Sequence, residues 1–222
     1  MTLTEGPQMK LYVYDHCPFC VKARAVFGLK AVPFDLVVLL NDDAETPTRM
    51  IGKKMAPILE HDGRYIPESM DIVAYVDGLA GPSILAGAPN PQVAQWLEAA
   101  SADLYPLAMP RWGAADLAEF ATPEARAGFQ RNKEAIIGPF SDRLAESEDR
   151  IARLNAILLS LEDLIQSPEA VNGVLSEDDI HLFAALRALS IVRGIAYPPA
   201  VYAYRFRMAT RTGVDLHDPI AA

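Results

Sequence analysis

Cysteine is scarce in this 222-residue sequence, which contains only Cys17 and Cys20. Long hydrophobic runs are also missing, since no apolar stretch approaches the roughly 20 residues that a membrane-spanning helix needs. Positive charge is in the minority, and the net charge of −9 opposes attraction to phosphate backbones and anionic lipids. We therefore expect neither nucleic acids nor membranes among the partners of this protein.

The first ten residues, MTLTEGPQMK, have neither the basic start nor the apolar stretch of a secretory signal. They are interpreted as a short polar extension before Met9. Hydrophobic residues make up 51% of the chain and charged residues 22%, which is typical of a globular protein with a sizeable core. The expected compartment is the cytoplasm.

The two cysteines are separated by only two residues, in the segment YDHCPFCVKA at 14–23. A structural disulfide is disfavoured because cytosolic thiol pools keep such bonds rare, and because closing so short a loop adds little stability. A zinc site needs four ligands, yet the sequence has no second cysteine pair. Its four histidines show no metal-ligand spacing: His16, His61, His181 and His217. Redox chemistry is therefore the favoured interpretation, and no bound metal is expected.

The first third of the chain alternates between strand and helix patterns. β-Branched and aromatic runs predict strands, prolines suit the first turns of two helices, and Asp62-Gly63 is the favoured pair of a tight hairpin turn. The predicted elements are a strand at 10–14, a helix at 17–32, a strand at 33–40, a short helix at 46–54, a hairpin at 57–66 and a helix at 68–80. The strand–helix–strand order predicts that the first two strands pair in parallel.

Beyond residue 80 the pattern changes to helix throughout. The segment GPSILAGAPNP at 81–91 holds two glycines and three prolines and is the best linker candidate. Helical periods follow at 92–112, 122–147, 149–167, 175–194 and 199–212. Ser176 and Asp179 have the spacing of a capping box at the start of one of these helices. The sequence thus divides into a small α/β domain and a larger all-helical domain.

Cys17 is expected at the N-terminal end of the first helix, directly before Pro18. The positive end of the helix dipole and the free backbone amides favour a thiolate there, and cysteines in such Cys-X-X-Cys positions can have pKa values of roughly 3.5 to 7.5. Cys20 lies in the first turn and is expected to be less exposed. These positions predict that Cys17 attacks and Cys20 resolves. His16 and Lys22 would add positive potential, although an ordinary surface side chain is the favoured interpretation of each.

Four segments carry a likeness to a known family: KLYVYDHCPFCVKARAVFGLK, VVLLNDDAETPTRMIGKKMAPIL, RYIPESMDIVAYVD and AVNGVLSEDDIHLF. They closely resemble the bacterial glutaredoxin 2 family, and the likeness runs from about Met9 to the C-terminus. The resemblance implies a thioredoxin-like α/β domain at 9–80, a linker at 81–91 and an all-α, glutathione-transferase-like domain at 92–222. It also implies glutathione-dependent reduction of disulfides.

The resemblance assigns roles that spacing alone does not show. Pro57, in MAPIL, matches the cis proline that faces the active cysteine in thioredoxin-like folds, so Ala56 is expected to offer backbone hydrogen bonds to the cysteinyl part of glutathione. Glu68 and Ser69, in PESMDI, match the stretch that holds the γ-glutamyl group of glutathione. Phe19 departs from the usual glutaredoxin pattern, which has tyrosine there, and the missing hydroxyl is expected to tune substrate contacts.

The predicted function is reduction of glutathione mixed disulfides and protein disulfides through the Cys-Pro-Phe-Cys site, with Cys17 and Cys20 as the catalytic pair. Glutathione is then a co-substrate, no cofactor is tightly bound, and the protein partners carry disulfides or bound glutathione. The resemblance suggests a monomer. Two alternatives stay open, a glutathione transferase that conjugates electrophiles and a non-enzymatic interaction module with a transferase fold.

Overall fold

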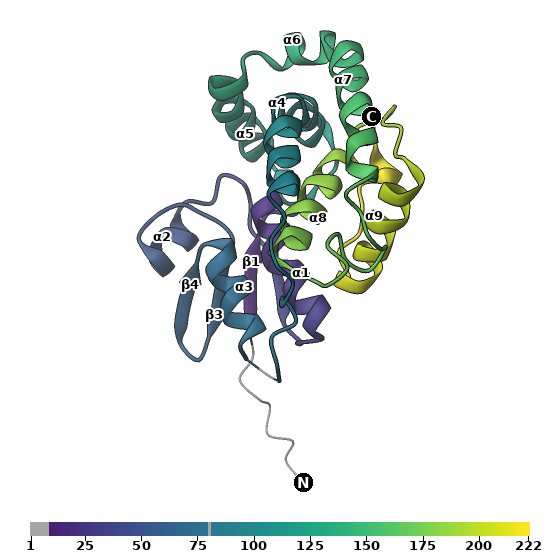
Figure 1. The fold of residues 1–222 in the computed structure, drawn as a ribbon. Coiled ribbons are helices and arrows are strands. Elements are labelled where there is room, and N and C mark those ends of the chain that lie inside the picture. The colour runs from purple at the N-terminus through teal and green to yellow at the C-terminus, as the bar shows by residue number, and fades with distance from the viewer. Residues whose placement is uncertain (1–8, 80) are drawn as a thin grey trace.

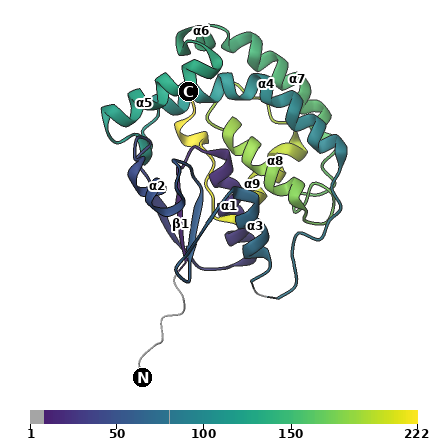
Figure 2. The same ribbon diagram turned by 90° about the vertical axis from the view of Figure 1, so that its left-hand side faces the viewer.

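The computed structural model describes residues 9–79 and 81–222. The polar extension expected before Met9 lies outside these residues. Figure 1 shows an α/β part that carries the sheet and a larger part built from helices, and Figure 2 shows the same two parts turned by 90°. The predicted order, α/β first and all-helical second, is confirmed.

A four-stranded sheet forms the centre of the α/β part, with strand order β2-β1-β3-β4. Its strands are β1 (Lys10–Val13), β2 (Asp35–Val38), β3 (Ile58–His61) and β4 (Arg64–Pro67). The strands β1 and β2 pair in parallel, as the sequence predicted, and the other neighbours pair antiparallel. The hairpin prediction is also confirmed, because Asp62 and Gly63 have the positive φ angles, 51° and 71°, that a two-residue turn of this kind requires.

Helix α1 joins the two parts of the molecule. The α/β part contains α1 (Pro18–Lys30), α2 (Glu45–Ile51) and α3 (Ser69–Asp77). Helix α1 packs against α3 within its own part and against α8 (Glu177–Leu189) and α9 (Pro199–Thr212) of the helical part (Figures 1 and 2). The approach to α9 depends on Gly28, because a Cβ there would lie 2.0 Å from the carbonyl oxygen of Thr212.

The helical part also contains α4 (Pro91–Ala114), α5 (Pro123–Ile137), α6 (Phe140–Ala145) and α7 (Ser147–Glu162). One prediction was wrong, since residues 122–147 form two helices instead of one. Gly138, with a φ of 85°, ends α5, and the proline after it cannot continue the helix. Two short 3-10 helices were not expected, η1 (Ala118–Phe120) and η2 (Asp218–Ile220). The capping box at the start of α8 is confirmed.

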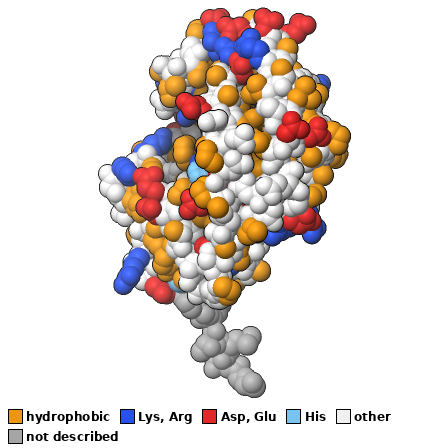
Figure 3. Space-filling model, viewed as in Figure 1, with side chains coloured by type: hydrophobic (Ala, Val, Ile, Leu, Met, Phe, Trp, Pro, Cys, Tyr) orange, Lys and Arg blue, Asp and Glu red, His pale blue; other side chains and the backbone are white. Residues whose placement is uncertain are grey.

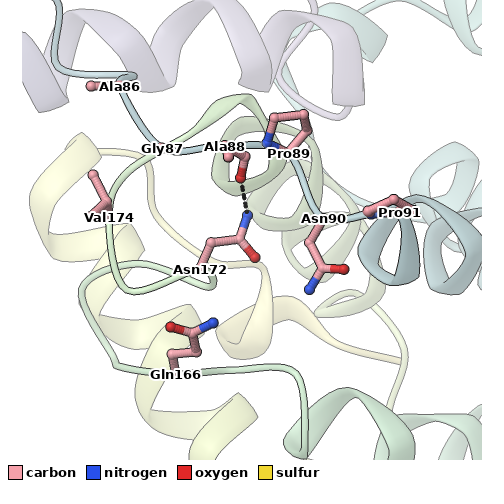
Figure 4. A pocket seen from close by; sticks show the side chains of 9 residues that line it. All are labelled: Ala86, Gly87, Ala88, Pro89, Asn90, Pro91, Gln166, Asn172 and Val174. Carbon is pink, nitrogen blue, oxygen red and sulfur yellow. Dashed lines mark hydrogen bonds between the residues drawn. The ribbon is translucent and has the colours of Figure 1, made fainter.

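The segment that connects the two parts is bound to the helical part. Asn172 Nδ2 donates a hydrogen bond to the carbonyl oxygen of Ala88 at 3.2 Å (Figure 4), and Asn90 N donates to Asp178 Oδ2 at 2.6 Å. This segment borders a cavity of about 460 Å³, but none of the predicted site residues lines that cavity. The limits of the linker, and with them the domain limits, stay a prediction.

Candidate active site

Cys17 and Cys20 lie at the start of α1, where the chain has left the end of β1. Cys17 occupies the N-cap position and Pro18 the first helical position, as the sequence predicted. Both thiols are free; Cys17 is half-buried, whereas Cys20 is fully buried. The more accessible sulfur is therefore the one at the end of the helix.

The pKa of Cys17 is lowered to about 6, so its thiol is mostly ionised at neutral pH. The hydrogen bond from the Cys20 thiol is the largest cause. Burial opposes ionisation, while the charge of His16 and the backbone amides of Cys20 and Phe19 favour it. The Cys17 side chain makes no capping hydrogen bond at the start of α1. The Cys20 thiol therefore lowers the pKa of Cys17 more than the helix end does, although the sequence prediction relied on the helix end.

Cys20 is shifted in the opposite direction. Burial raises its pKa well above the usual value, and the hydrogen bond to Cys17 and the charge of Cys17 raise it further. The Cys20 sulfur also accepts a hydrogen bond from Tyr14 N at 3.3 Å. The proton of the pair therefore resides on Cys20, which is the distribution that the predicted roles require.

The residues assigned to glutathione lie at the edge of the sheet where the cysteine motif begins. In the sheet register, Tyr12 of β1 is opposite Ile58 of β3, and Ile58 is opposite Pro67 of β4. The end of β1, the start of β3 and the end of β4 therefore meet at one edge. Ala56 and Pro57 lie directly before β3, and the peptide bond between them is cis, as the resemblance implied.

Glu68 and Ser69 begin α3 directly after β4. Glu68 has a φ of 65°, in the left-handed region that residues other than glycine adopt uncommonly. Such backbone conformations cluster at ligand sites, where the surrounding fold maintains them. Ser69 is buried, whereas the Glu68 carboxylate is exposed and lies 3.3 Å from Lys53 Nζ. Sequence reasoning missed Lys53, a cation that this contact brings to the same edge.

Sequence reasoning also missed a buried pair beside the cysteine motif. His16 was expected on the surface, but it is only 6% exposed, and Glu119 of η1 is 0% exposed. His16 Nδ1 lies 2.7 Å from Glu119 Oε1, and the same oxygen accepts a hydrogen bond from His16 N at 2.9 Å. The rings of Trp112, Phe120 and Phe129 contact the imidazole ring. No local pattern signals this pair, because its members are 103 residues apart in the sequence.

The helical part also lines a cavity beside Pro18, at the start of α1. Helices α1, α4 and α8 enclose a cavity of about 130 Å³ whose lining includes Lys22, Tyr105 and His181. Lys22, expected on the surface, is half-buried, and its Nζ lies 4.9 Å from the centroid of the exposed Phe19 ring. Burial raises the pKa of Tyr105 and the charge of Cys17 raises it further, so the α4 face is within electrostatic reach of the sulfur. Figure 3 shows that the surface is hollowed where the two parts meet.

The site contains the chemical groups that are needed for thiol–disulfide exchange. One sulfur is ionised and accessible, and a second sulfur, protonated and buried, is hydrogen-bonded to it. Such a pair can attack a disulfide and then close an internal one. Within residues 9–79 and 81–222, no cluster of three or more His, Cys, Asp or Glu side chains could hold a metal ion.

Two family models match the chain. Residues 92–221 match the model described as glutaredoxin 2, C terminal domain, and residues 11–84 match the model described as glutathione S-transferase, N-terminal domain. The first of these matches covers more than half of the 222 residues. Together they confirm the predicted fold class, a thioredoxin-like α/β domain followed by an all-α, glutathione-transferase-like domain.

Relatives match over nearly the whole chain. Glutaredoxin 2 of Escherichia coli K12 is 51% identical over 214 residues, which are 96% of this chain and 100% of the relative. The crystal structure of glutaredoxin 2 from Salmonella typhimurium in complex with glutathione matches with a TM-score of 0.96 and 51% identity, over 98% of this chain and 100% of that one. A glutathione transferase from Phanerochaete chrysosporium shares the fold, with a TM-score of 0.72 at 15% identity over 94% of this chain and 99% of that one.

Proposed function

This chain belongs to the glutaredoxin 2 family and is a glutathione-dependent thiol–disulfide oxidoreductase, and from that premise we propose that Cys17 is its nucleophile and Cys20 its resolving thiol. The observation that carries the proposal is the lowered pKa of Cys17 beside a thiol that stays protonated. A thiol with a pKa near 6 is mostly anionic at neutral pH and is also a good leaving group. It can therefore enter and leave mixed disulfides rapidly.

Reduction of a glutathione mixed disulfide needs only Cys17. Its thiolate attacks the glutathione sulfur, a bond forms between Cys17 and glutathione, and the substrate leaves as a thiolate that takes a proton from water. The thiolate of a second glutathione then attacks the glutathione sulfur bound to Cys17. Oxidised glutathione leaves, and Cys17 returns to its anionic form.

Reduction of a protein disulfide needs Cys20 as well. After Cys17 has formed a mixed disulfide with the protein, its negative charge is gone, and with it one cause of the raised pKa of Cys20. Cys20 can then lose its proton and attack the Cys17 sulfur, which releases the protein as a dithiol and leaves a disulfide between the two cysteines. Two glutathione molecules reduce that disulfide and become oxidised glutathione.

We further propose that glutathione, the co-substrate, binds at the sheet edge next to Cys17. Ala56, before the cis proline Pro57, offers its backbone to the cysteinyl part, and Glu68 and Ser69 hold the γ-glutamyl group. The left-handed backbone of Glu68 and the burial of Ser69 support this assignment, since both are typical of a site shaped for a ligand. The Salmonella typhimurium relative, crystallised in complex with glutathione, supports glutathione binding by this chain.

Exchange of each cysteine for serine tests the roles. Cys17→Ser is expected to eliminate reduction of a glutathione mixed disulfide, because the nucleophile is lost. Cys20→Ser is expected to retain much of that activity and to impair mainly the reduction of a protein disulfide. The two variants are matched controls for each other, as both replace one sulfur by oxygen in the same helical turn. Equal activity in the wild type and Cys17→Ser would refute the mechanism.

Exchange of the glutathione contacts tests the binding site. Glu68→Gln removes a charge and Ser69→Ala removes a hydroxyl. Each is expected to raise the KM for glutathione about 5- to 150-fold, which corresponds to a loss of about 1–3 kcal/mol. Glu45→Gln is the control, because Glu45 is an exposed carboxylate at the start of α2, outside the proposed site. An unchanged KM in both site variants would contradict the assignment.

We propose that the protein acts as a cytoplasmic monomer on glutathionylated and disulfide-containing proteins. No helix within the described residues combines the length and the apolar character needed to cross a membrane. The reducing cytosol would keep both thiols free, as the reaction requires. Size-exclusion chromatography with light scattering tests the monomer directly, since a mass near twice 24.2 kDa would contradict it.

A further inference from the structure

Glu119 is a residue of the helical part that contacts the cysteine motif directly. It belongs to η1, and its side chain is 0% exposed. Its Oε1 accepts a hydrogen bond from His16 N at 2.9 Å and lies 2.7 Å from His16 Nδ1. Its backbone carbonyl accepts a hydrogen bond from Asn41 N at 2.8 Å. One residue thus fixes both the main chain and the ring of the residue that precedes Cys17.

A fully buried carboxylate is unfavourable unless a positive charge compensates it. Glu119 Oε2 has no hydrogen-bond partner among the residues that the structure describes, so His16 is the cationic group in direct contact with this carboxylate. Burial raises the pKa of Glu119, but the hydrogen bond and the charge of His16 outweigh burial, and the net direction is downward. The contact with His16 therefore favours the ionised form of the Glu119 carboxylate.

We propose that Glu119 is a positioning residue, which holds the His16 ring as an imidazolium beside Cys17, so that the helical part sets how much of the reactive thiol is ionised. The inference rests on the proposed role of Cys17 as the nucleophile. It goes beyond that role, because it assigns to the helical part, which contains no cysteine, an influence on the ionisation of Cys17. The imidazolium acts by Coulomb attraction, which is strong here because aromatic rings exclude water from around it.

Other titratable groups surround the two side chains, but each differs from His16 in what it can supply. Lys22 is partly desolvated, which lowers its pKa, although the charge of Cys17 raises it. Arg187 is engaged by Asp15, and burial lowers the pKa of His217, which favours its neutral form. Arg24 is likewise engaged by Asp15, and Arg126 donates to backbone carbonyl oxygens. Four further groups carry no positive charge: Tyr14, Cys20, Asp43 and Tyr105. His16 is thus the cation whose charge one neighbouring carboxylate controls.

The variant Glu119→Gln tests the proposal because it keeps the shape and the acceptor oxygen but removes the charge. The pKa of Cys17, followed by the ultraviolet absorbance of the thiolate, is expected to rise by about one unit. The rate of alkylation by iodoacetamide at pH 6 should then fall about five-fold, since the thiolate fraction drops from roughly one half to one tenth. A direct effect of the lost negative charge has the opposite sign, so an unchanged or lowered pKa overturns the proposal.

The variant His16→Gln shows whether Glu119 acts through the ring. His16→Gln alone is expected to raise the pKa of Cys17, and Glu119→Gln added to it should cause no further rise. Equal rises from Glu119→Gln with and without His16 would contradict the proposal. Nitrogen NMR of the His16 ring in the wild-type protein gives an answer even where a variant fails to fold. An imidazolium signal at pH 7 is expected, and a neutral ring overturns the proposal.

Asp15→Asn is the matched control, because the Asp15 carboxylate lies at the same interface but is hydrogen-bonded to Arg24, Arg187 and His217 instead of the His16 ring. It is expected to leave the pKa of Cys17 unchanged or slightly lowered, since it removes a negative charge nearby. A rise equal to that of Glu119→Gln would indicate a general structural effect and would overturn the proposal. These readouts do not depend on turnover, so they fail separately from the proposed function, which Cys17→Ser tests.

Discussion

Two carboxylates cross the interface between the α/β part and the helical part near the cysteine motif, in opposite directions. Asp15 extends from the α/β part, and two arginines and one histidine surround its carboxylate. Its oxygens lie 2.6 Å from Arg24 Nη1, 2.8 Å from Arg187 Nη2 and 3.2 Å from His217 Nε2. Burial raises its pKa, but the bonds to His217 and Arg187 and the charge of Arg24 outweigh burial and hold the pKa well below its usual range.

Glu119 extends from the helical part, and the basic side chain that the structure places against its carboxylate is that of His16. That partner precedes Cys17 in the chain and contributes to the lowered pKa of its thiol. Two arginines compensate the charge of the Asp15 carboxylate, so its main effect is to stabilise the contact between the two parts. A carboxylate with a single titratable partner controls the charge of that partner. We therefore expect Asp15 to determine stability and Glu119 to determine reactivity.

The largest effect is expected from Arg187→Met, which removes the main helical-part partner of Asp15. Arg187 is 2% exposed and also donates to the carbonyl oxygens of Asp15 and Asp215. Breaking a buried pair on one side costs about 3–5 kcal/mol of unfolding free energy, because the other charge remains. Urea denaturation measures this loss. A larger shift in the pKa of Cys17 than Glu119→Gln causes would contradict the expectation that Asp15 determines stability and Glu119 determines reactivity.

Asp15→Asn is expected to cost about 1.5–3 kcal/mol at pH 7, the range for hydrogen bonds to charged groups. The pKa of Asp15 is depressed in the folded state, so its contribution is present above the unfolded value, about 3.9, and is lost as the pH falls toward the folded value. The stability difference between wild type and variant should therefore narrow between pH 5 and about pH 2. A difference that stays constant in urea titrations over this range would contradict the role of Asp15.

Gly28→Ala tests whether the stability of the interface between the two parts also depends on an uncharged contact. The added Cβ would lie 2.0 Å from the Thr212 carbonyl oxygen, and backbone cannot move aside as a flexible side chain can. We expect a loss of about 1–3 kcal/mol in unfolding free energy, typical of overpacking. Thermal denaturation at pH 7 and pH 4 provides the check, because this loss should not depend on pH. Unchanged stability would show that α1 and α9 can separate freely.

The smallest effect is expected from Arg49→Ala, which removes an exposed ion pair with Glu45 inside α2. The two charged groups are 3.6 Å apart and both are largely exposed. Such a pair contributes about 0.3–0.5 kcal/mol, and salt screens it. Unfolding free energies measured in low and high salt should differ little from the wild type. A loss comparable to that of Asp15→Asn would show that burial does not explain the difference between these pairs.

Local patterns predicted most of the α/β part. The strand–helix–strand order, the Asp62-Gly63 turn and the proline after Cys17 are signals that lie within a few residues of the structure they specify. The cis bond at Pro57 came from family resemblance alone, since nothing in its neighbourhood distinguishes it from a trans proline that starts a strand.

The interface could not be predicted in the same way. His16 was expected on the surface, but aromatic rings from residues 112–129 bury it. Glu119 lies in a short 3-10 helix that periodicity does not reveal. The break at Gly138 was missed because amphipathic spacing continues on both sides of it. Contacts between distant segments depend on tertiary packing, which a single sequence does not display.

Titration of the thiolate absorbance of the reduced wild-type protein tests the central claim most directly, with Cys17→Ser as the control. One thiol should ionise with a midpoint near pH 6, and that step should be absent from Cys17→Ser. The second thiol should stay protonated until the pH is well above 9. A protein that shows no thiolate below the ordinary cysteine range of about 8.5 would contradict the account.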